Sequence, residues 1–145
     1  MKNKYVKAHM AVAHQYAMLS SAIRLQVGCI IVKDNRIISI GYNGMPTGWD
    51  NCCEDIIGDN NGTPVLKSKP EVLHAETNAI AKLASTYESG KDASLFVTHQ
   101  PCLDCAKIIY QSGIKEVFYA HEYRERAGVD FLNQCGIETT KVTEY

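Results

Sequence analysis

Two short segments that carry metal-binding residue types constrain this chain more than any other feature. The first is His-Ala-Glu at residues 74–76, and the second is Pro-Cys-Leu-Asp-Cys at residues 101–105. One imidazole and two thiolates supply three ligands for Zn²⁺, which prefers four tetrahedral ligands, so a set of three leaves one position for water. Glu76 stands two residues after the histidine, where it is better suited to carry a proton beside that water than to serve as a fourth ligand. The pattern therefore favours an open, catalytic zinc site.

The spacing of these residues predicts that they lie at the starts of two helices. Cys102 and Cys105 are three positions apart, so in the first turn of a helix their sulfur atoms lie on one side. Pro101 suits a helix start, because it lacks a backbone donor and has a preset φ. A second helix is expected from about His74, because apolar residues then recur at helical spacing. A purely structural zinc site and a Cys-x-x-Cys redox pair are the alternative interpretations.

The first half of the chain predicts one helix followed by a hairpin. Apolar residues at 27–32 and 37–42 flank a polar turn, which is typical of two antiparallel strands. Residues 49–70 have little periodicity and many loop-forming residues, so we expect a long functional or interface loop there. An amphipathic helix is expected within residues 1–22, where one helical face comprises Val6, Met10, Ala13 and Ala17.

From residue 74 onward, helices and strands are expected to alternate. Helices are predicted over residues 74–87, 102–112 and 127–134, and strands over residues 94–98, 115–120 and 137–142. Strand–helix–strand units with short links form parallel strand pairs with right-handed crossovers. We therefore predict a single α/β domain over residues 1–145, in which helices cover both faces of a mixed sheet as three α/β/α layers. The zinc-binding residues then lie at the carboxyl edge of the sheet, where open α/β folds bind ligands.

Composition and charge narrow the class of protein. The net charge of −1 argues against a nucleic-acid partner, and the chain has no run of about 20 apolar residues that predicts a membrane span. The N-terminal segment has the early lysines of a signal peptide, but His9 and His14 interrupt its apolar part. The six cysteines include Cys-x-x-Cys with a partner histidine, which in an unsecreted chain indicates metal binding. We therefore expect a cytoplasmic protein.

The motifs, taken in order along the chain, resemble those of the cytidine deaminase superfamily, and within it the deoxycytidylate (dCMP) deaminases. They span residues 41–46, 74–80, 98–105 and 121–124. His-x-Glu followed by Pro-Cys-x-x-Cys is the signature of zinc nucleobase deaminases. The Gly-Tyr-Asn-Gly-x-Pro loop is similar to that of the dCMP branch. The resemblance implies a five-stranded sheet, a homohexamer in many members, and the conversion of dCMP and water to dUMP and ammonia.

The resemblance also implies roles for single residues around the reacting base. His74, Cys102 and Cys105 would hold zinc, and Glu76 would be the proton shuttle of the hydrolysis. Asn43 would contact the deoxyribose or the base of a nucleotide substrate. The alternative for Asn43 is that it only supplies left-handed backbone geometry in a turn.

Three further residues match positions expected around the nucleotide and its 5′-phosphate, namely Arg24, Tyr123 and Arg124. Each has an alternative structural role. Arg24 could cap the first helix or pair with an acidic residue. Tyr123 could simply be packed, and Arg124, which lies beside two glutamates, could be a solvated charge.

Regulation and a second metal are also implied for some relatives. Many relatives respond to dCTP and dTTP, with Mg²⁺, through the loop that here contains Gly41, Tyr42 and Gly44. Some relatives carry a second, structural zinc in the segment before His-Ala-Glu. Cys52 and Cys53 suggest such a site, although residues 54–73 contain no histidine.

Two competing functions remain open. The first is deamination of another substrate, such as cytidine, guanine or an adenosine in tRNA; the net charge of −1 argues against tRNA. The second is a non-catalytic module that binds zinc or a nucleotide. Glu76 argues against that module, because a purely structural zinc site has no use for a neighbouring carboxylate.

Overall fold

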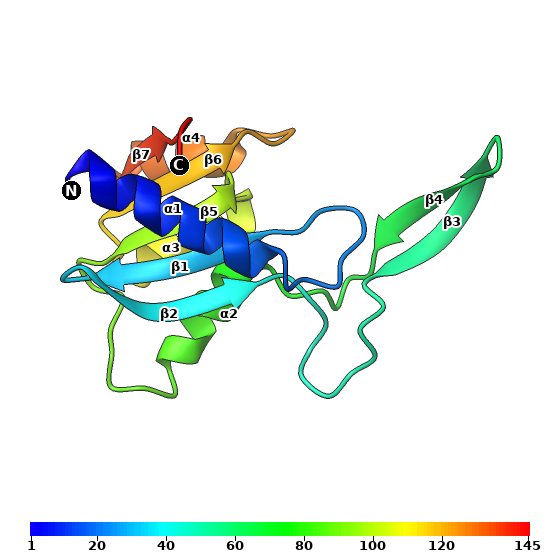
Figure 1. Cartoon of the computed structure of the whole chain (residues 1–145), viewed down its shortest axis with the longest axis horizontal. Helices are drawn as coiled ribbons and strands as arrows, with labels where there is room; N and C mark the ends of the chain where they lie inside the picture. Colours follow the sequence, from blue (N-terminus) through cyan, green and yellow to red (C-terminus); the bar gives the residue numbers. More distant parts are fainter.

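The computed structural model describes all residues from 1 to 145. Its helices are α1 (Asn3–Ala17), α2 (Ala75–Leu83), α3 (Leu103–Gln111) and α4 (Ala127–Gln134). Its strands are β1 (Gly28–Lys33), β2 (Arg36–Tyr42), β3 (Glu54–Asn60), β4 (Thr63–Ser68), β5 (Ser94–His99), β6 (Glu116–His121) and β7 (Glu138–Lys141). Five strands form one mixed sheet in the order β2-β1-β5-β6-β7, and β3 and β4 form a separate hairpin (Figure 1). β1 is antiparallel to β2 and β5, whereas β5, β6 and β7 are parallel.

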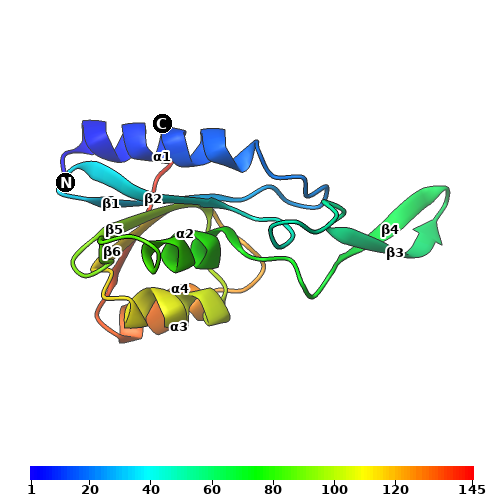
Figure 2. The same ribbon diagram turned by 90° about the horizontal axis from the view of Figure 1, so that it is seen from below.

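Helices cover both faces of the five-stranded sheet. Figure 2 shows α1 on one face and α2, α3 and α4 on the other. The predicted α/β class with three layers and a mixed five-stranded sheet is therefore confirmed. The β5–α3–β6 unit supplies the parallel pair that its strand–helix–strand pattern predicts. No helix combines the length and the apolar character that a bilayer crossing requires.

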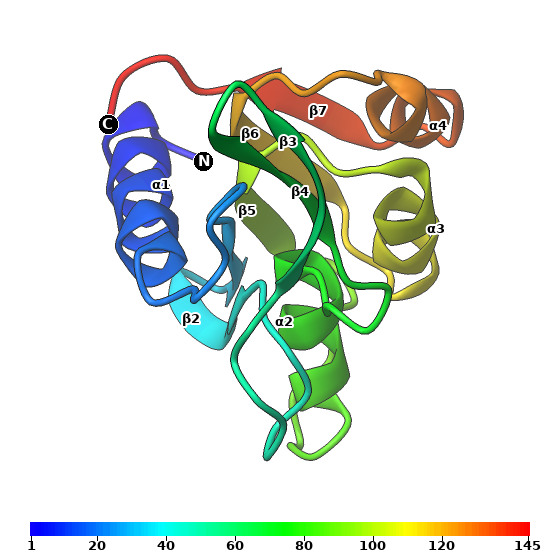
Figure 3. The same cartoon turned by 90° about the vertical axis from the view of Figure 1, so that its right-hand side faces the viewer.

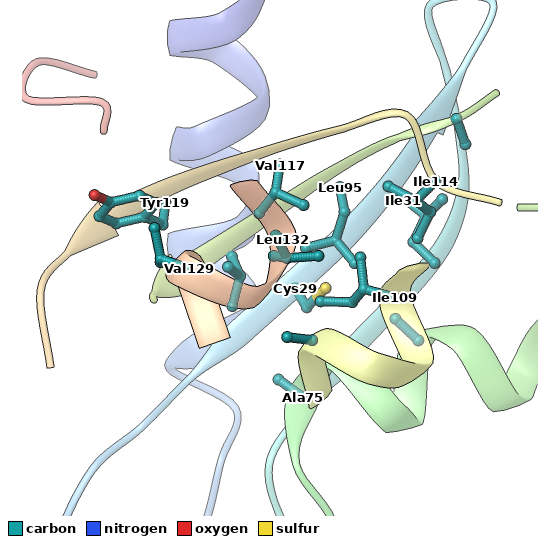
Figure 4. Packing of buried hydrophobic residues seen from close by; sticks show 14 of the residues in the cluster. Cys29, Ile31, Ala75, Leu95, Ile109, Ile114, Val117, Tyr119, Val129 and Leu132 are labelled. Carbon is teal, nitrogen blue, oxygen red and sulfur yellow. The ribbon is translucent and has the colours of Figure 1, made fainter. Parts of the chain in front are cut away.

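The larger apolar core lies between the sheet and the three helices of one face. Leu95 and Val117 of neighbouring strands meet Ala75 of α2, Ile109 of α3 and Leu132 of α4 in this cluster (Figure 4). All five are fully or almost fully buried. This core holds the N-terminus of α2 close to α3, and these are the two helices that carry the metal-binding motifs.

A smaller core lies between the sheet and α1. Met10 of α1 packs in one cluster with Phe96 of β5 and Phe118 of β6, whose rings stack with centroids 4.6 Å apart. The buried positions of α1 include the four that its sequence pattern predicts. Gly28 allows α1 to pack directly on β1, because a Cβ atom there would overlap the backbone of Ala13. Helical periodicity thus selected the correct buried face of this helix.

The expected loop over residues 49–70 is wrong, because most of it forms the β3–β4 hairpin. The two strands pair in antiparallel register from Glu54 opposite Ser68 to Asn60 opposite Thr63. Asn61 and Gly62 both have positive φ, of 52° and 87°, as a two-residue hairpin turn requires. The hairpin projects from the body (Figures 1 and 2), and we call residues 54–68 the arm.

Helix α2 is shorter than the expected span of residues 74–87. It ends at Leu83, and the backbone continues through turns over residues 84–86. The hydroxyls of Ser85 and Thr86 donate hydrogen bonds to the carbonyls of Lys82 and Leu83, at 3.0 and 2.9 Å. The same two carbonyls also accept the backbone N–H groups of Ser85 and Thr86, so each residue binds its turn twice, and the helix gives way to turns before the apolar pattern ends.

Candidate active site

The three predicted zinc ligands come together at the starts of α2 and α3. His74 is the N-cap residue of α2, Cys102 is the N-cap residue of α3, and Cys105 lies in the first turn of α3. Helix α3 therefore begins two residues after Pro101 rather than at it. The ligand atoms of the three residues all lie within 4.8 Å of one another. The histidine is exposed, Cys102 is half-buried and Cys105 is buried, so the group opens to solvent on one side.

The geometry of this group fits a tetrahedral zinc ion. His74 Nδ1 lies 3.3 Å from Cys105 Sγ and 3.6 Å from Cys102 Sγ. Zinc bonds of about 2.05 Å to nitrogen and 2.3 Å to sulfur, set at tetrahedral angles, separate two such ligands by roughly 3.5 Å. Hydrogen bonds from Cys105 and His74 also lower the pKa of the Cys102 thiol to about 4. A thiolate is therefore favoured at Cys102, whereas the same hydrogen bond and burial raise the pKa of the Cys105 thiol.

Glu76 lies beside this group in the first turn of α2. Its side chain is only 5% exposed, and it lines the same cavity as His74 and Cys102. Burial raises the pKa of Glu76 to about 7, because desolvation disfavours the carboxylate. A carboxyl group with such a pKa can both accept and release a proton near neutral pH.

A cavity of about 440 Å³ opens next to these residues. It is large enough for a nucleotide-sized ligand. Its walls include all four residues that the sequence predicts for substrate binding: Arg24, Asn43, Tyr123 and Arg124. These residues come from two loops and from the end of β2, so the fold gathers segments that lie far apart in the chain. Cys105 and the glycine-rich loop residues Gly41, Tyr42 and Gly44 do not line it.

Asn43 ties the loop before β1 to the end of β2. Its side-chain oxygen accepts a hydrogen bond from the backbone N–H of Val27 at 2.9 Å, and its amide nitrogen donates to the carbonyl of Leu25 at 2.8 Å. The alternative of a left-handed turn residue is wrong, because Asn43 is not among the residues with positive φ. Asn43 thus shapes the cavity wall and holds the loop that carries Arg24.

The two arginines that line the cavity have no acidic partner. Arg24 donates from Nη1 to Ser68 Oγ at 3.3 Å, and it lies well beyond the end of α1, so it does not cap that helix. Arg124 donates from Nη2 to the hydroxyl of Tyr123 at 3.0 Å, and its guanidinium lies over that ring. Neither arginine takes part in an ion pair. Both remain available to an anionic ligand.

Sequence reasoning missed two neighbouring residues of the cavity wall: His99, the last residue of β5, and Gln100, which lies between it and Pro101. Burial, helped by the nearby His121 and His14, lowers the pKa of His99 to about 4, so this imidazole is neutral at physiological pH. Gln100 is only 4% exposed, and its Nε2 donates to the carbonyls of Tyr123 and Glu125 at 2.7 and 2.8 Å. Gln100 therefore anchors the loop of Arg124 to the zinc motif. Their place directly before Pro-Cys-x-x-Cys was the one available sequence signal.

A third cavity residue that the sequence reasoning missed is Lys69, which follows the arm. It fell within the segment expected to be a loop, so no local pattern pointed to it.

The possible second zinc site, suggested by Cys52 and Cys53, gains no further metal-binding side chain in the structure. The thiols of Cys52 and Cys53 face the backbone carbonyls of Glu54 and Asn51, at 3.3 and 3.6 Å, and neither belongs to a cluster of three metal-binding side chains.

Comparison with known proteins identifies the family. Residues 3–121 match the family described as the cytidine and deoxycytidylate deaminase zinc-binding region. Human deoxycytidylate deaminase is 44% identical over 140 residues, which cover 91% of this chain and 76% of the human protein. Deoxycytidylate deaminase of Enterobacteria phage T4 is 32% identical over 168 residues, with 92% of this chain and 87% of the phage protein covered. ComE operon protein 2 of Bacillus subtilis is 35% identical over 137 residues, covering 92% of this chain and 68% of that protein.

Solved structures agree with this assignment. The crystal structure of dCMP deaminase from the cyanophage S-TIM5, in complex with dCMP and dUMP, superposes with a TM-score of 0.87. That protein is 40% identical in sequence, and the match covers 98% of this chain and 99% of the cyanophage chain. The His-x-Glu and Pro-Cys-x-x-Cys motifs, the three clustered ligand atoms and these similarities lead to one conclusion: the chain belongs to the cytidine and deoxycytidylate deaminase family.

Proposed function

We propose that this protein is a zinc-dependent deaminase that hydrolyses dCMP to dUMP with release of ammonia. The observation that carries the proposal is the group of three metal-binding side chains, with buried Glu76 beside it, at a cavity that also contains two unpaired arginines. His74, Cys102 and Cys105 would hold the zinc ion. A bound zinc ion would supply a hydroxide nucleophile at neutral pH and would stabilise developing negative charge.

Glu76 is the proton carrier in this proposal. As a carboxylate it takes the proton of the attacking water and passes it to N3 of the pyrimidine while C4 is attacked. It then takes the remaining proton of the added hydroxyl and delivers it to the exocyclic nitrogen, which leaves as ammonia while the C4 carbonyl forms. A pKa of about 7 suits both steps, and positioned acid–base catalysis contributes roughly 10² to 10⁴ in rate.

The substrate side of the cavity is proposed to recognise a 5′-monophosphate. Arg24 and Arg124 are forked donors that suit phosphate oxygens. Tyr123 holds the guanidinium of Arg124, and Asn43 shapes the wall next to the sugar and base. The neutral imidazole of His99 lines the same cavity and adds no charge there.

The domain extent, location, oligomeric state and regulation of the protein are proposed by analogy with the family. We propose a single catalytic domain over residues 1–145, a cytoplasmic location and a homo-oligomer, with a hexamer as the expected form. We also propose that dCTP and dTTP, with Mg²⁺, act as effectors through the loop of Gly41, Tyr42 and Gly44. The exposed apolar residues of the arm, such as Ile56 at 72% exposure, support association with other subunits.

The decisive experiment is a panel of cytidine, deoxycytidine, CMP, dCMP and dCTP, scored for ammonia release with and without dCTP or dTTP as effector. The proposal expects the highest kcat/KM for dCMP. Preference for a nucleoside or for dCTP would assign another substrate within the family. Absence of ammonia release from every compound, with zinc bound, would instead indicate a non-catalytic module.

A further inference from the structure

The lining of the cavity carries an excess of positive charge. Arg24, Lys69 and Arg124 all line it, and Glu76 is the one acidic residue among the lining side chains. The chain as a whole carries a net charge of −1, so this excess is local. Cationic side chains gathered without matching carboxylates repel one another unless an anion lies between them. The cavity is therefore suited to an anionic ligand.

Lys69 is well placed to act on that anion. Its backbone N–H donates to the carbonyl of Cys53 at 2.8 Å, which fixes the residue at the base of the arm. Asp55 is the one carboxylate near its ammonium group, with Asp55 Oδ1 3.7 Å from Lys69 Nζ. The aspartate side chain is largely exposed, and long, exposed ion pairs contribute little free energy. The Lys69 ammonium can therefore turn from Asp55 to a ligand at small cost.

The base of the arm also holds the loop that carries Arg24. Ser68, directly before Lys69, accepts the hydrogen bond from Arg24. At the start of the other strand, the carboxylate oxygens of Glu54 lie 2.9 and 3.1 Å from the backbone N–H of Ile23. Glu54 is only 6% exposed, whereas the rest of its strand is exposed. Both strands of the arm thus meet the Arg24 loop, and they bring Arg24 next to Lys69.

The projecting part of the arm does not pack into either apolar core. Its two strands pack on each other, and no helix or strand of the body makes an extensive contact with them. In Figure 3 the arm stands in front of the five-stranded sheet. The part of the arm that is built into the molecule is therefore its base, which is also a wall of the cavity.

We propose that Lys69 contacts the 5′-phosphate of the nucleotide substrate together with Arg24, so that the base of the arm determines specificity for a nucleotide over a nucleoside. This inference rests on the proposed deaminase function. Arg24 and Arg124 offer planar forks to the phosphate oxygens, and Lys69, next to Arg24 at the base of the arm, adds a compact point charge.

The test compares dCMP with deoxycytidine as substrates of wild type, Lys69→Met and Lys69→Arg. Lys69→Met is expected to lower kcat/KM for dCMP by about 10- to 100-fold, mainly through a higher KM, because it removes one charge-assisted contact. Its kcat/KM for deoxycytidine, which has no phosphate, should change less than about threefold by the same argument. Lys69→Arg keeps the charge and should recover most of the dCMP activity. Lys67→Met is the matched control, because Lys67 lies on β4, two residues before Lys69, and does not line the cavity.

A binding measurement separates this inference from the proposed function. Calorimetric titration with dUMP needs no turnover, and Lys69→Met should weaken dUMP binding by a factor similar to the loss in kcat/KM. Equal losses on dCMP and deoxycytidine, or unchanged binding of dUMP, would overturn the role of Lys69 and leave the deaminase proposal intact. A wild type that binds dUMP through Lys69 but deaminates no substrate would overturn the deaminase proposal alone.

Discussion

At the scale of single residues, the proposed chemistry depends on one carboxyl group, whose pKa is set by its burial. Glu76 is excluded from solvent at the start of α2, and its pKa is raised to about 7 for that reason. Its two neighbours in function, His74 and Cys102, remain partly open to the cavity. A proton carrier and an open metal site thus share one helix start, so a substitution at Glu76 can separate chemistry from metal binding.

Glu76→Gln should keep the fold and the zinc but lower kcat by at least about 100-fold, because an amide has nearly the same shape and cannot carry the proton. Zinc content by elemental analysis and kcat for dCMP would check this. Glu71→Gln, which changes an exposed carboxylate outside the cavity, is the control and should have wild-type kcat. Turnover of Glu76→Gln within a few-fold of wild type would remove Glu76 from the mechanism.

His99 makes stability depend on pH. Its pKa is lowered to about 4 in the folded protein, whereas an unfolded chain has a value near 6.5. Between these two values the unfolded state binds more protons, so His99 lowers the free energy of unfolding as the pH falls from about 6.5 to about 4. For this half-buried side chain, after discounting for solvent screening, the loss should be about 1–2 kcal/mol.

Urea unfolding of wild type and His99→Gln at pH 7.5 and pH 5 would measure this loss. The difference between the two proteins cancels the pH dependence of the metal ligands, which both share. The wild type should lose more stability than the variant on acidification. An equal loss in both proteins would mean that His99 is not protonated on unfolding in this range.

At the scale of elements, the site depends on how closely α2 packs on the sheet. A Cβ atom at Gly41 would meet the carbonyl of Ala75 and the backbone nitrogen of Ala79, so glycine is required where β2 passes under this helix. Ser39, two residues earlier on β2, donates a hydrogen bond to the carbonyl of Ala79. The strand therefore fixes the first turns of the helix that presents His74 and Glu76. Gly44, in the same loop motif, has open space around its Cα atom.

Gly41→Ala should destabilise the protein by about 1–3 kcal/mol, the range for overpacking a closely packed contact, and should lower kcat because α2 is displaced. Gly44→Ala is the matched control, since nothing lies within 4 Å of the added methyl group and its φ is not positive. Denaturant unfolding and dCMP kinetics would check both variants. Equal destabilisation by the two substitutions would contradict this account of Gly41.

At the scale of the whole molecule, the metal group joins helices that are separate in sequence. His74 caps the start of α2, and Cys102 and Cys105 lie at the start of α3, which follows β5 in the sequence. A zinc ion held by all three would link the two helices in the folded state only. Metal binding to such a preformed group therefore contributes to folding stability.

Removal of zinc by a chelator should abolish deamination and lower Tm by at least about 5 °C, because the folded state alone loses its ligand. Calorimetry before and after chelation would measure the shift, and added zinc should restore both Tm and activity. The Cys102→Ala variant should show a much smaller shift on chelation, since it lacks one ligand. An unchanged Tm of the wild type would mean that the metal does not stabilise this fold.

Much of the fold followed from local patterns in the sequence. The buried face of α1, the β1–β2 hairpin and the α3 and α4 spans were predictable, because hydrophobic periodicity reports which face of an element is buried. The residue types of the metal group were also predictable, because zinc chemistry restricts the ligands to a few side chains at short spacings. The end of α2 was not, since the chain leaves the helix after Leu83 through turns that both the backbone and the hydroxyls of Ser85 and Thr86 stabilise, although the apolar pattern continues.

The arm shows where local reasoning stopped. The Asn61-Gly62 turn was a readable hairpin signal, but the flanking strands are almost wholly exposed and lack the alternation that a buried face imposes. Which side of the arm faces the cavity depends on Glu54 and Ser68 reaching the Arg24 loop, some 30 to 44 residues away in sequence. No short window contains that information.

The sequence by itself therefore determined the α/β class, the residue types around the proposed zinc ion and the carboxyl group beside them, because each depends on neighbours within a few residues. Only the tertiary structure decided that Lys69, His99 and Gln100 share one cavity with Arg24. It also decided that Asn43 bonds the loop before β1 and that Gly41 touches α2. These outcomes depend on contacts between distant segments, which form only when the sheet, its helices and the arm are packed together.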